Sequence, residues 1–289
     1  GPYRIVRLLG EGGMGRVYEA EQDEPVRRRV ALKLTRGGLD PERIIARFHA
    51  ERQALAVLDH PNIARVFDAG STPEGRPWFA MELVEGEPIT RWAQRRKLSL
   101  KQRIELLLPV CDAVQHAHRK GVIHRDLKPS NLLVVDADGV GVPKIIDFGI
   151  AKAIQAPLLA QSTATKFGEL VGTPEYMSPE QATLGAVDID TRTDVYALGL
   201  VLYELLVGEL PMSVEQVRRY AFDELCRRIR EDDTPRPSAR LASVSQDTRT
   251  SMASGDWARR LRGDLDSVVL KALARSEERR VGKECRSRW

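Results

Sequence analysis

Short runs of β-branched and aromatic residues dominate the first third of the chain and alternate with glycine-rich or charged connections. Three of them, YRIVRLL, GRVYEA and RVALKL, fall within residues 3–34, and two more, IARVFDAG and RPWFAMELV, fall within residues 63–84. Runs of this kind, separated by turn residues, are typical of antiparallel strands. Between the two groups one helix is predicted, with an N-cap, a proline at the first helical position and apolar residues on one face: Asp40, Pro41, Ile44, Ile45, Phe48, Leu55 and Leu58.

Beyond Gly86 and Pro88 the apolar residues recur every three to four positions, which is typical of packed helices. The spacing predicts helices at residues 100–119, 194–206, 214–230 and 264–274. LLVV and PKII predict a short strand pair between the first two of these helices. Two stretches lack a pattern: residues 147–180 form a long loop of a kind that is usually functional or disordered, and residues 232–256 have the composition of a linker or mobile surface loop.

Composition limits the class of protein. A chain of 289 residues is compatible with one large domain or with two lobes, and its 42% of hydrophobic residues is typical of a globular protein. No uninterrupted apolar run is long enough to span a membrane, since the richest, residues 195–207, contains Glu204. The three cysteines, Cys111, Cys226 and Cys285, are too few and too scattered for a disulfide framework or a zinc site, which favours a reducing compartment and predicts the cytoplasm.

The last stretch, RSEERRVGKECRSRW at residues 275–289, breaks the pattern of what precedes it. It resembles the in-frame translation of a sequencing-library adapter, and we expect it to be an artefactual tail outside the folded domain. It holds six Lys and Arg and three Asp and Glu, and thus +3 of the net charge of +4. The net charge is therefore weak support for nucleic-acid binding, and none is expected. Because the chain does not begin with methionine, we expect a fragment of a longer protein.

The sequence LGEGGMGRVY carries Gly10, Gly12 and Gly15 in a G-x-G-x-x-G arrangement, followed by Val17. Glycines suit phosphate binding because a backbone without Cβ can approach phosphate oxygens and offer its N–H groups. Dinucleotide-binding turns of this type are followed by a helix. Here the next run is β-branched and aromatic, so the pattern favours a strand–turn–strand lid, with a purely structural hairpin as the alternative.

Lys33 lies among the apolar residues of VALK, where an ammonium group needs an anionic partner. Glu51 on the predicted helix is the candidate, because it shares an inward face with Leu55 one turn later. Taken singly, Lys33 could instead be a surface lysine at the end of a strand, and Glu51 could be a solvated glutamate on a helix face.

The stretch HRDLKPSN, residues 124–131, gathers an acid, two bases and an amide next to a proline. Asp126 is a candidate general base or hydroxyl-orienting group, Lys128 can neutralise a transferring phosphoryl group, and Asn131 can hold a divalent metal. Sixteen residues later DFG supplies Asp147 as a second metal ligand, and Gly149 allows a sharp turn. Oxygen ligands of this kind suit Mg²⁺, which binds one or two carboxylates together with substrate phosphates.

Eight motifs in order make the chain resemble a bacterial eukaryotic-like Ser/Thr protein kinase over residues 3–274. They are GEGGMGRVY, VALK, Glu51 on its helix, HPNI, HRDLKPSN, DFG, GTPEYMSPE and DVYALG. One such motif can arise by chance, but eight in sequence cannot. The resemblance implies an α+β, two-lobed protein-kinase fold: an N-lobe of antiparallel sheet plus one main helix at residues 1–84 and a mostly helical C-lobe at residues 85–274.

The resemblance also implies the roles of single residues. Lys33 would grip the α- and β-phosphates of ATP and pair with Glu51. Asp126 would receive the substrate hydroxyl and Lys128 would contact the γ-phosphate, while Asn131 and Asp147 would bind Mg²⁺, with Mn²⁺ as a substitute. The implied ATP-binding set comprises the glycine loop, the gatekeeper Met81, the hinge and the residues around adenine: Gly10, Glu11, Gly12, Gly13, Gly15, Val17, Ala31, Lys33, Met81, Glu82, Val84 and Leu133.

The acceptor class is implied by the lysine two residues after Asp126 and by Thr173, which resemble Ser/Thr kinases and not tyrosine kinases. Thr173 would hydrogen-bond Asp126 and Lys128. Arg125 is expected to be a buried cation that requires an anion, which in this family is a phosphorylated activation loop. QSTATKFGELVGT offers Ser162, Thr163 and Thr165, and we expect autophosphorylation at Thr163 or Thr165, with a merely polar loop as the alternative.

Structural roles follow from the same resemblance. Phe148 and His124 would stack with Leu55 and Val66 in a column that sets the active state, although plain core packing explains these residues as well. Asp194 would anchor the backbone of residues 124–131. Glu180 would pair with a late arginine, and Arg280 has the expected position although it lies in the suspect tail.

Three other interpretations compete with an active kinase. A pseudokinase scaffold would typically lack Lys33, Asp126 or Asp147, and all three are present. A small-molecule phosphotransferase of similar fold usually lacks the HRDLKPSN and SPE blocks together. A truncated, unstable fragment is the third. The expected partners are protein substrates, ATP and a transient second copy of the chain during autophosphorylation. This fragment contains no predicted membrane segment, but a membrane anchor elsewhere in the longer protein remains an alternative.

Overall fold

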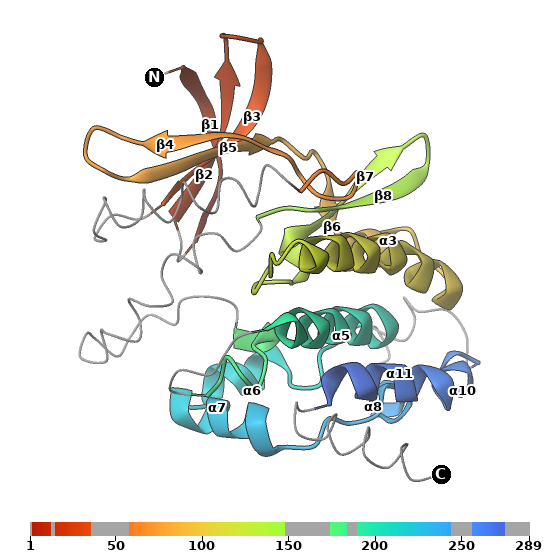
Figure 1. The fold of residues 1–289 in the computed structure, drawn as a ribbon. Coiled ribbons are helices and arrows are strands. Elements are labelled where there is room, and N and C mark those ends of the chain that lie inside the picture. The colour runs from red at the N-terminus through yellow and green to blue at the C-terminus, as the bar shows by residue number, and fades with distance from the viewer. Residues whose placement is uncertain are drawn as a thin grey trace.

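The computed structural model describes residues 2–12, 15–35, 58–147, 174–183, 190–243 and 256–274. A β-sheet from the first part of the chain lies above a group of helices from the second part, as Figure 1 shows. Strands come first and helices dominate afterwards, so the predicted α+β, two-lobed architecture is confirmed. Within the described ranges no helix is long and apolar enough to cross a membrane.

Five antiparallel strands form the N-terminal sheet in the order β1-β2-β3-β5-β4. They are β1 (Tyr3–Gly12), β2 (Gly15–Gln22), β3 (Arg28–Thr35), β4 (Val66–Ser71) and β5 (Pro77–Glu82). Val17 pairs with Lys33 across β2 and β3, and Ala31 pairs with Met81 across β3 and β5. The register therefore brings residues of the implied ATP site together from three strands.

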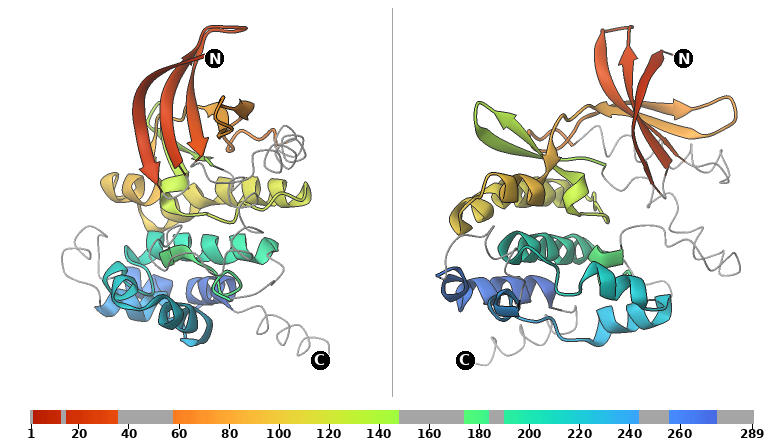
Figure 2. Two further views of the ribbon diagram at one scale, coloured as in Figure 1. Left: turned by 90° about the vertical axis from the view of Figure 1, so that its left-hand side faces the viewer. Right: turned by 180° about the vertical axis from the view of Figure 1, so that it is seen from behind.

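The second part of the chain contains a small sheet and most of the helices. The sheet consists of β6 (Glu87–Pro88), β7 (Leu132–Ala137) and β8 (Val140–Ile145). The helices are α2 (Ile89–Arg95), α3 (Leu100–Arg119), α5 (Thr191–Val207), α6 (Val214–Arg219), α7 (Phe222–Glu231), α8 (Pro237–Ser243), α10 (Trp257–Leu261) and α11 (Asp264–Leu273), with short 3-10 turns η1 (Pro129–Asn131) and η2 (Pro174–Tyr176). Figure 2 shows from two further sides that β7 and β8 lie above α3, on the same side as the five-stranded sheet.

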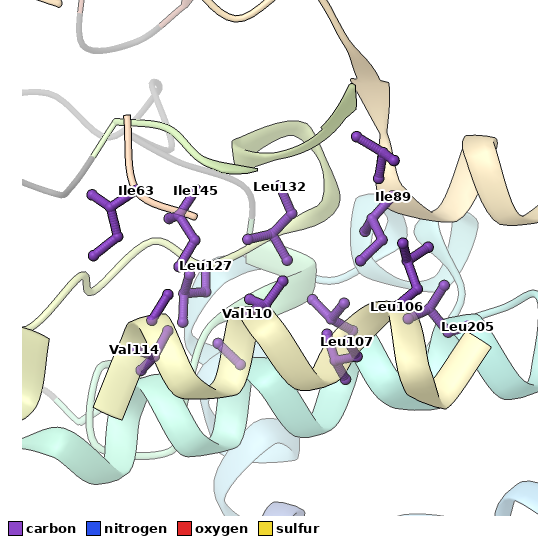
Figure 3. Packing of buried hydrophobic residues seen from close by; sticks show 14 of the residues in the cluster. Ile63, Ile89, Leu106, Leu107, Val110, Val114, Leu127, Leu132, Ile145 and Leu205 are labelled. Atoms are coloured by element: carbon purple, nitrogen blue, oxygen red, sulfur yellow. The ribbon is translucent and has the colours of Figure 1, made fainter. Parts of the chain in front are cut away.

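The main hydrophobic core joins α3 to the segments that carry the motifs. Figure 3 shows Val110 and Val114 of α3 close to Leu127, Leu132 and Ile145. Leu127, Leu132 and Ile145 are completely buried. Each such side chain stabilises the fold by about 1.5–3 kcal/mol through the area it removes from water. Residues 124–131 and the β7–β8 hairpin are therefore held in place by the core.

Side-chain caps fix the two central helices. Ser99 and Gln102 form a reciprocal capping box at the start of α3. Asp190 caps α5 by accepting a hydrogen bond from the Arg192 amide at 2.8 Å, and Gly208 ends the helix with φ +83°, a conformation that suits glycine. A fixed start of α5 also fixes Asp194 in its first turn.

Several sequence predictions are confirmed and two are wrong. The helix predicted at residues 100–119 is α3, and the predicted strand pair is β7 and β8. The single helix predicted at residues 214–230 is in fact two, because the chain is extended at Tyr220 and Ala221. The predicted linker at residues 232–256 contains α8. The helix expected after Asp40 and the tail lie outside the described residues. So do residues 148–173 of the long loop predicted at residues 147–180, whose described end contains the turn η2.

Candidate active site

The motif at residues 124–131 forms an irregular loop between α3 and β7 that ends in the turn η1. Pro129 starts that turn, which suits its fixed φ and its missing N–H. Arg125 has φ +65°, a left-handed conformation that is costly for a residue with a Cβ. Backbone strain of this kind persists only where surrounding contacts over-determine it, and it concentrates at functional sites.

Asp194 supplies those contacts. Its carboxylate is completely buried and accepts hydrogen bonds from the amides of His124 and Arg125, both at 2.8 Å. The same carboxylate contacts Nε2 of His118 at 2.7 Å. The prediction that Asp194 anchors the backbone of this loop is confirmed, and His118 is an additional partner that the sequence did not reveal.

His124 connects the loop to the segment that carries Asp147. Its Nδ1 accepts from the Asp126 amide at 3.2 Å and its Nε2 lies 3.1 Å from the carbonyl of Ile146. Because one ring nitrogen accepts, the other carries the proton in the neutral ring and donates to Ile146. The Ile146 amide in turn donates to the Asn131 carbonyl at 2.9 Å. The loop at residues 124–131 and the chain next to Asp147 are therefore one hydrogen-bonded unit.

Asp126, Lys128 and Asn131 converge at the centre of the site. Lys128 Nζ lies 3.0 Å from Asp126 Oδ2. Asn131 Nδ2 donates to the Asp126 carbonyl at 2.7 Å and lies 3.4 Å from its carboxylate. Because the amide nitrogen faces Asp126, the side-chain oxygen of Asn131 is the atom left to act as a ligand. The loop thus presents a carboxylate, an ammonium group and an amide oxygen within a few ångströms.

Lys33 of β3 pairs with Asp147, whose two carboxylate oxygens both accept from its Nζ. The Lys33 side chain is only 6% exposed, and a buried ammonium group needs such an anion. Asp147 has φ +57°, a second left-handed residue in the site. The expected partner of Lys33, Glu51, lies outside the described residues.

The residues expected around adenine form an apolar cluster. Val17, Ala31 and Met81 pack together, with Ala31 and Met81 buried. In the segment that follows Met81, the Glu82 amide donates to the Arg65 carbonyl at 2.8 Å, so it is not available to a ligand. The Glu82 side chain contacts Lys144. Leu133 on β7 is half-buried.

The glycine-rich turn joins β1 and β2, whose last register pair is Gly12 and Gly15. A Cβ on Gly10 or Gly12 would meet no atom within 4 Å. At Gly15, φ is +138° and a Cβ would lie 2.1 Å from the Leu34 carbonyl oxygen, so only glycine fits. Glu11 forms an ion pair with Arg16 at 3.0 Å. Gly13 lies outside the described residues.

The structure describes only some of the other residues that the sequence analysis singled out. Phe148, Leu55, Thr173, Arg280 and the hydroxyl cluster at residues 162–165 lie outside the described residues. Glu180 accepts from the Thr193 hydroxyl at 2.8 Å. Arg125 was expected to be buried, and this is wrong: the residue is of intermediate exposure, and it is its backbone amide and carbonyl that Asp194 and Gln181 hold.

Gln181 is a site residue that sequence reasoning missed. Its side-chain amide donates to the Arg125 carbonyl at 2.9 Å, and its backbone amide lies 3.4 Å from the Ser178 hydroxyl. A polar residue directly after SPE is the one signal in the sequence that could have pointed to it. Together with Asp194 it holds both sides of the strained residue Arg125.

The family model for the protein kinase domain matches residues 3–283. The chain belongs to this family. It is 39% identical over 283 residues to the serine/threonine-protein kinase Pkn1 of Myxococcus xanthus, covering 97% of this chain and 36% of the relative. It is 38% identical over 284 residues to the serine/threonine-protein kinase PknB of Mycobacterium tuberculosis, covering 96% of this chain and 40% of the relative. This kinase domain therefore spans about two fifths of the length of the curated relatives it matches.

Solved structures agree with this placement. The crystal structure of the Mycobacterium tuberculosis PknI kinase domain is 25% identical in sequence, with a TM-score of 0.57, covering 94% of this chain and 95% of that chain. The identification of a bacterial eukaryotic-like Ser/Thr kinase catalytic domain from its motifs is thus confirmed.

Proposed function

We propose that this domain transfers the γ-phosphoryl group of Mg·ATP to Ser and Thr hydroxyls of protein substrates. The observation that carries the proposal is the convergence of Asp126, Lys128 and Asn131 on one strained loop. The relatives named as Ser/Thr-protein kinases support the same reaction class. We place the division between the two lobes at residues 84 and 85, in the connection between β5 and β6.

The donor set fits a magnesium ion. Asp147 offers carboxylate oxygens and Asn131 an amide oxygen, the hard ligands that Mg²⁺ prefers, with nucleotide phosphates completing its coordination. The pairing of Asp147 with Lys33 shows that its carboxylate attracts cations. A bound Mg²⁺, or Mn²⁺ in its place, would neutralise charge that develops on the phosphates. The described residues contain no group of three or more His, Cys, Asp and Glu side chains that could hold a metal.

Asp126 and Lys128 act on the transferred group. In the proposed reaction the acceptor oxygen forms a bond to the γ-phosphorus, the bond from that phosphorus to the ADP oxygen breaks, and the hydroxyl proton passes to Asp126. Lys128 stabilises the negative charge of the phosphoryl oxygens. Lys128 Nζ lies 3.0 Å from Asp126 Oδ2, so the two side chains can act on the same phosphoryl transfer.

Lys33 and the apolar cluster bind the nucleotide. Val17, Ala31, Met81 and Leu133 offer apolar surface for adenine. The hinge at Glu82 and Val84 offers backbone groups other than the Glu82 amide, which donates to the Arg65 carbonyl. The glycine-rich turn would cover the phosphates, with Gly10, Glu11, Gly12, Gly13 and Gly15 as the residues expected to do so. Lys33 would exchange Asp147 for phosphate oxygens, and Glu51 would then hold it from the other side.

We further propose activation by autophosphorylation between residues 147 and 173, at Thr163 or Thr165, in a transient dimer. Arg125 supports this, because a guanidinium group is a favoured partner of a phosphate and the residue is not buried. Thr173 would hydrogen-bond Asp126 and Lys128 in the activated protein. Mass spectrometry of ATP-treated protein should find phosphate in this segment, and its absence would refute the activation proposal alone.

Asp126→Asn tests the reaction. We expect it to lower the rate of peptide phosphorylation by about 10²–10⁴-fold, because a positioned general base contributes that much. Asp136→Asn, an exposed change on β7, should leave the rate unchanged. Equal rates for wild type and Asp126→Asn would favour a pseudokinase. Phosphorylation of small molecules in preference to peptides would favour the alternative phosphotransferase. The cytoplasm remains the proposed location for this domain.

A further inference from the structure

The peptide unit that leads into Asp126 is held by a side chain from a distant part of the chain. Nε2 of Gln181 donates to the Arg125 carbonyl at 2.9 Å, across a separation of 56 residues. That carbonyl and the Asp126 amide belong to the same planar unit, and the amide lies 3.2 Å from Nδ1 of His124. Gln181 therefore fixes one side of the peptide whose other side begins the proposed base.

The side-chain amide of Gln181 has a defined orientation. Its Oε1 accepts from the Ser178 amide at 3.1 Å, while its Nε2 donates to the Arg125 carbonyl. A carboxamide can do both because it has an acceptor and a donor, whereas a carboxylate only accepts. Glutamate at this position would keep the bond to Ser178 and place an oxygen against the Arg125 carbonyl. Methionine would make neither bond.

The turn at residues 178–183, which carries Gln181, is fixed to the start of α5. Ser178 is completely buried, and its carbonyl accepts from the Ala182 amide at 3.0 Å. Glu180 accepts from the buried hydroxyl of Thr193 at 2.8 Å. The side chain of Gln181 therefore extends from a turn that is bonded both within itself and to α5.

Arg125 is held on both sides by this one unit of structure. Asp194, which follows Thr193 directly, accepts from the Arg125 amide at 2.8 Å, and Gln181 donates to the Arg125 carbonyl. The φ of Arg125 is +65°, and a strained backbone of this kind persists only while its surroundings hold it. Without the Gln181 bond, Arg125 could relax toward an ordinary conformation and would turn the peptide that leads to Asp126.

We propose that Gln181 is a positioning residue for phosphoryl transfer, which makes the placement of Asp126 depend on the turn at residues 178–183. The proposal rests on the proposed function of Asp126. Gln181 acts through the Arg125 carbonyl and not on the reacting atoms. Its bonds lead to Arg125 and Ser178, neither of which is proposed to bind ATP. A change at Gln181 should therefore appear in kcat and not in KM for ATP.

Steady-state phosphorylation by the full 289-residue chain tests the kinetic effect, with a pool of decapeptides that share one fixed threonine as acceptor. Gln181→Glu and Gln181→Met should both lower kcat by about 10- to 100-fold, because a small misplacement of a reacting group costs that much. KM for ATP should stay within about twofold of wild type. Gln94→Glu and Gln94→Met make the same changes at an exposed position of α2 and should match wild type.

Arg125→Gly provides a rescue that a merely structural role of Gln181 would not show. Glycine populates the left-handed conformation readily, so the loop should depend less on the bond from Gln181. In a double-mutant cycle, the loss of kcat caused by Gln181→Met should be at least about threefold smaller in the Arg125→Gly background. Equal losses in both backgrounds would overturn the proposal.

Amide hydrogen exchange without nucleotide separates this proposal from the proposed function. Gln181→Met should speed exchange in residues 124–131 by about fivefold or more, even if wild type transferred no phosphate. Should Gln181→Met fail to fold in a thermal melt, Gln181→Glu carries the test in its place, because it keeps the shape and the bond to Ser178. Unchanged exchange in residues 124–131, wild-type kcat in the folded variants, or a loss confined to KM for ATP would each overturn the positioning role.

Discussion

Lys33 and Asp147 form a direct ion pair, although Lys33 lies in β3 and Asp147 follows β8, 114 residues later. The pair joins the strand that carries the proposed phosphate-binding cation to the segment that carries the proposed metal-binding carboxylate. In the proposed function Asp147 would help to hold a metal ion and Lys33 would bind nucleotide phosphates, and without these ligands the two side chains pair with each other. Binding of Mg·ATP is therefore expected to break this contact and replace it with two stronger ones.

Lys33→Met should lower kcat for peptide phosphorylation by about 10²–10³-fold, since it removes one preorganised charge from the phosphate site. It should also abolish the rise in melting temperature that saturating Mg·ATP gives the wild type through mass action. Lys101→Met, the same change on the exposed face of α3, serves as the control in both measurements. Unaltered stabilisation by Mg·ATP in Lys33→Met would contradict the assigned role.

Asp194→Asn should lower the free energy of unfolding by about 2–4 kcal/mol, because a buried charged acceptor is lost and its new N–H₂ group faces backbone donors. The amides of His124 and Arg125 would compete for one oxygen, so the catalytic loop should loosen as well. Denaturant unfolding measures the first effect, and amide hydrogen exchange of residues 124–131 the second.

The comparison variant is Asp138→Asn at the exposed β7–β8 turn, where φ is +51° and asparagine is well tolerated. Its unfolding free energy should stay within about 0.5 kcal/mol of wild type. Wild-type stability and protection in Asp194→Asn would show that the loop is held by other contacts.

Local signals in the sequence were sufficient for most of the secondary structure. The end points of α3 could be predicted because Ser99 and Gln102 form a cap and apolar residues keep one period through to Arg119. The break between α6 and α7 could not, because Val217 and Leu225 keep helical spacing across it and the N-cap Ala221 carries no polar signal. Helix α8 is short and polar, so its composition matched that of a loop.

The candidate site could likewise be predicted from the sequence only in part. Asp126, Lys128 and Asn131 lie within six residues of one another, so their convergence follows from local sequence. The contact between His118 and Asp194 spans 76 residues and depends on how α3 packs on α5, which no local pattern encodes. The family resemblance predicted the anchoring role of Asp194, which residue spacing alone could not predict. It predicted no role for His118 or Gln181.

Gly15→Ala should destabilise the N-terminal sheet, whereas Gly12→Ala should be tolerated. At Gly15 a Cβ would lie 2.1 Å from the Leu34 carbonyl oxygen in a backbone conformation that other residues rarely adopt, so β2 and β3 would have to move apart. We expect a loss of about 1–3 kcal/mol in unfolding free energy from the backbone strain alone. At Gly12 a Cβ meets nothing within 4 Å, so stability should change by less than about 1 kcal/mol.

The same two variants separate stability from nucleotide binding. If the glycine turn covers the phosphates, Gly12→Ala should raise KM for ATP while its melting temperature stays near that of wild type. Equal melting temperatures for Gly15→Ala and wild type would contradict the packing seen between β2 and β3.

Glu204→Gln should change how stability depends on pH. Burial raises the pKa of Glu204 above its ordinary value of 4.5, with partial compensation from the hydrogen bond that Tyr176 donates. The folded state then binds a proton more tightly than the unfolded state, so the unfolding free energy falls as pH rises from the ordinary pKa through the raised one. Glutamine cannot ionise and can still accept from Tyr176. The variant should therefore match wild type near pH 4 and become the more stable protein at higher pH, as measured by denaturant unfolding across the range. Glu105→Gln is the comparison on the exposed face of α3, and parallel curves for Glu204→Gln and wild type would show that this carboxyl carries no burial penalty.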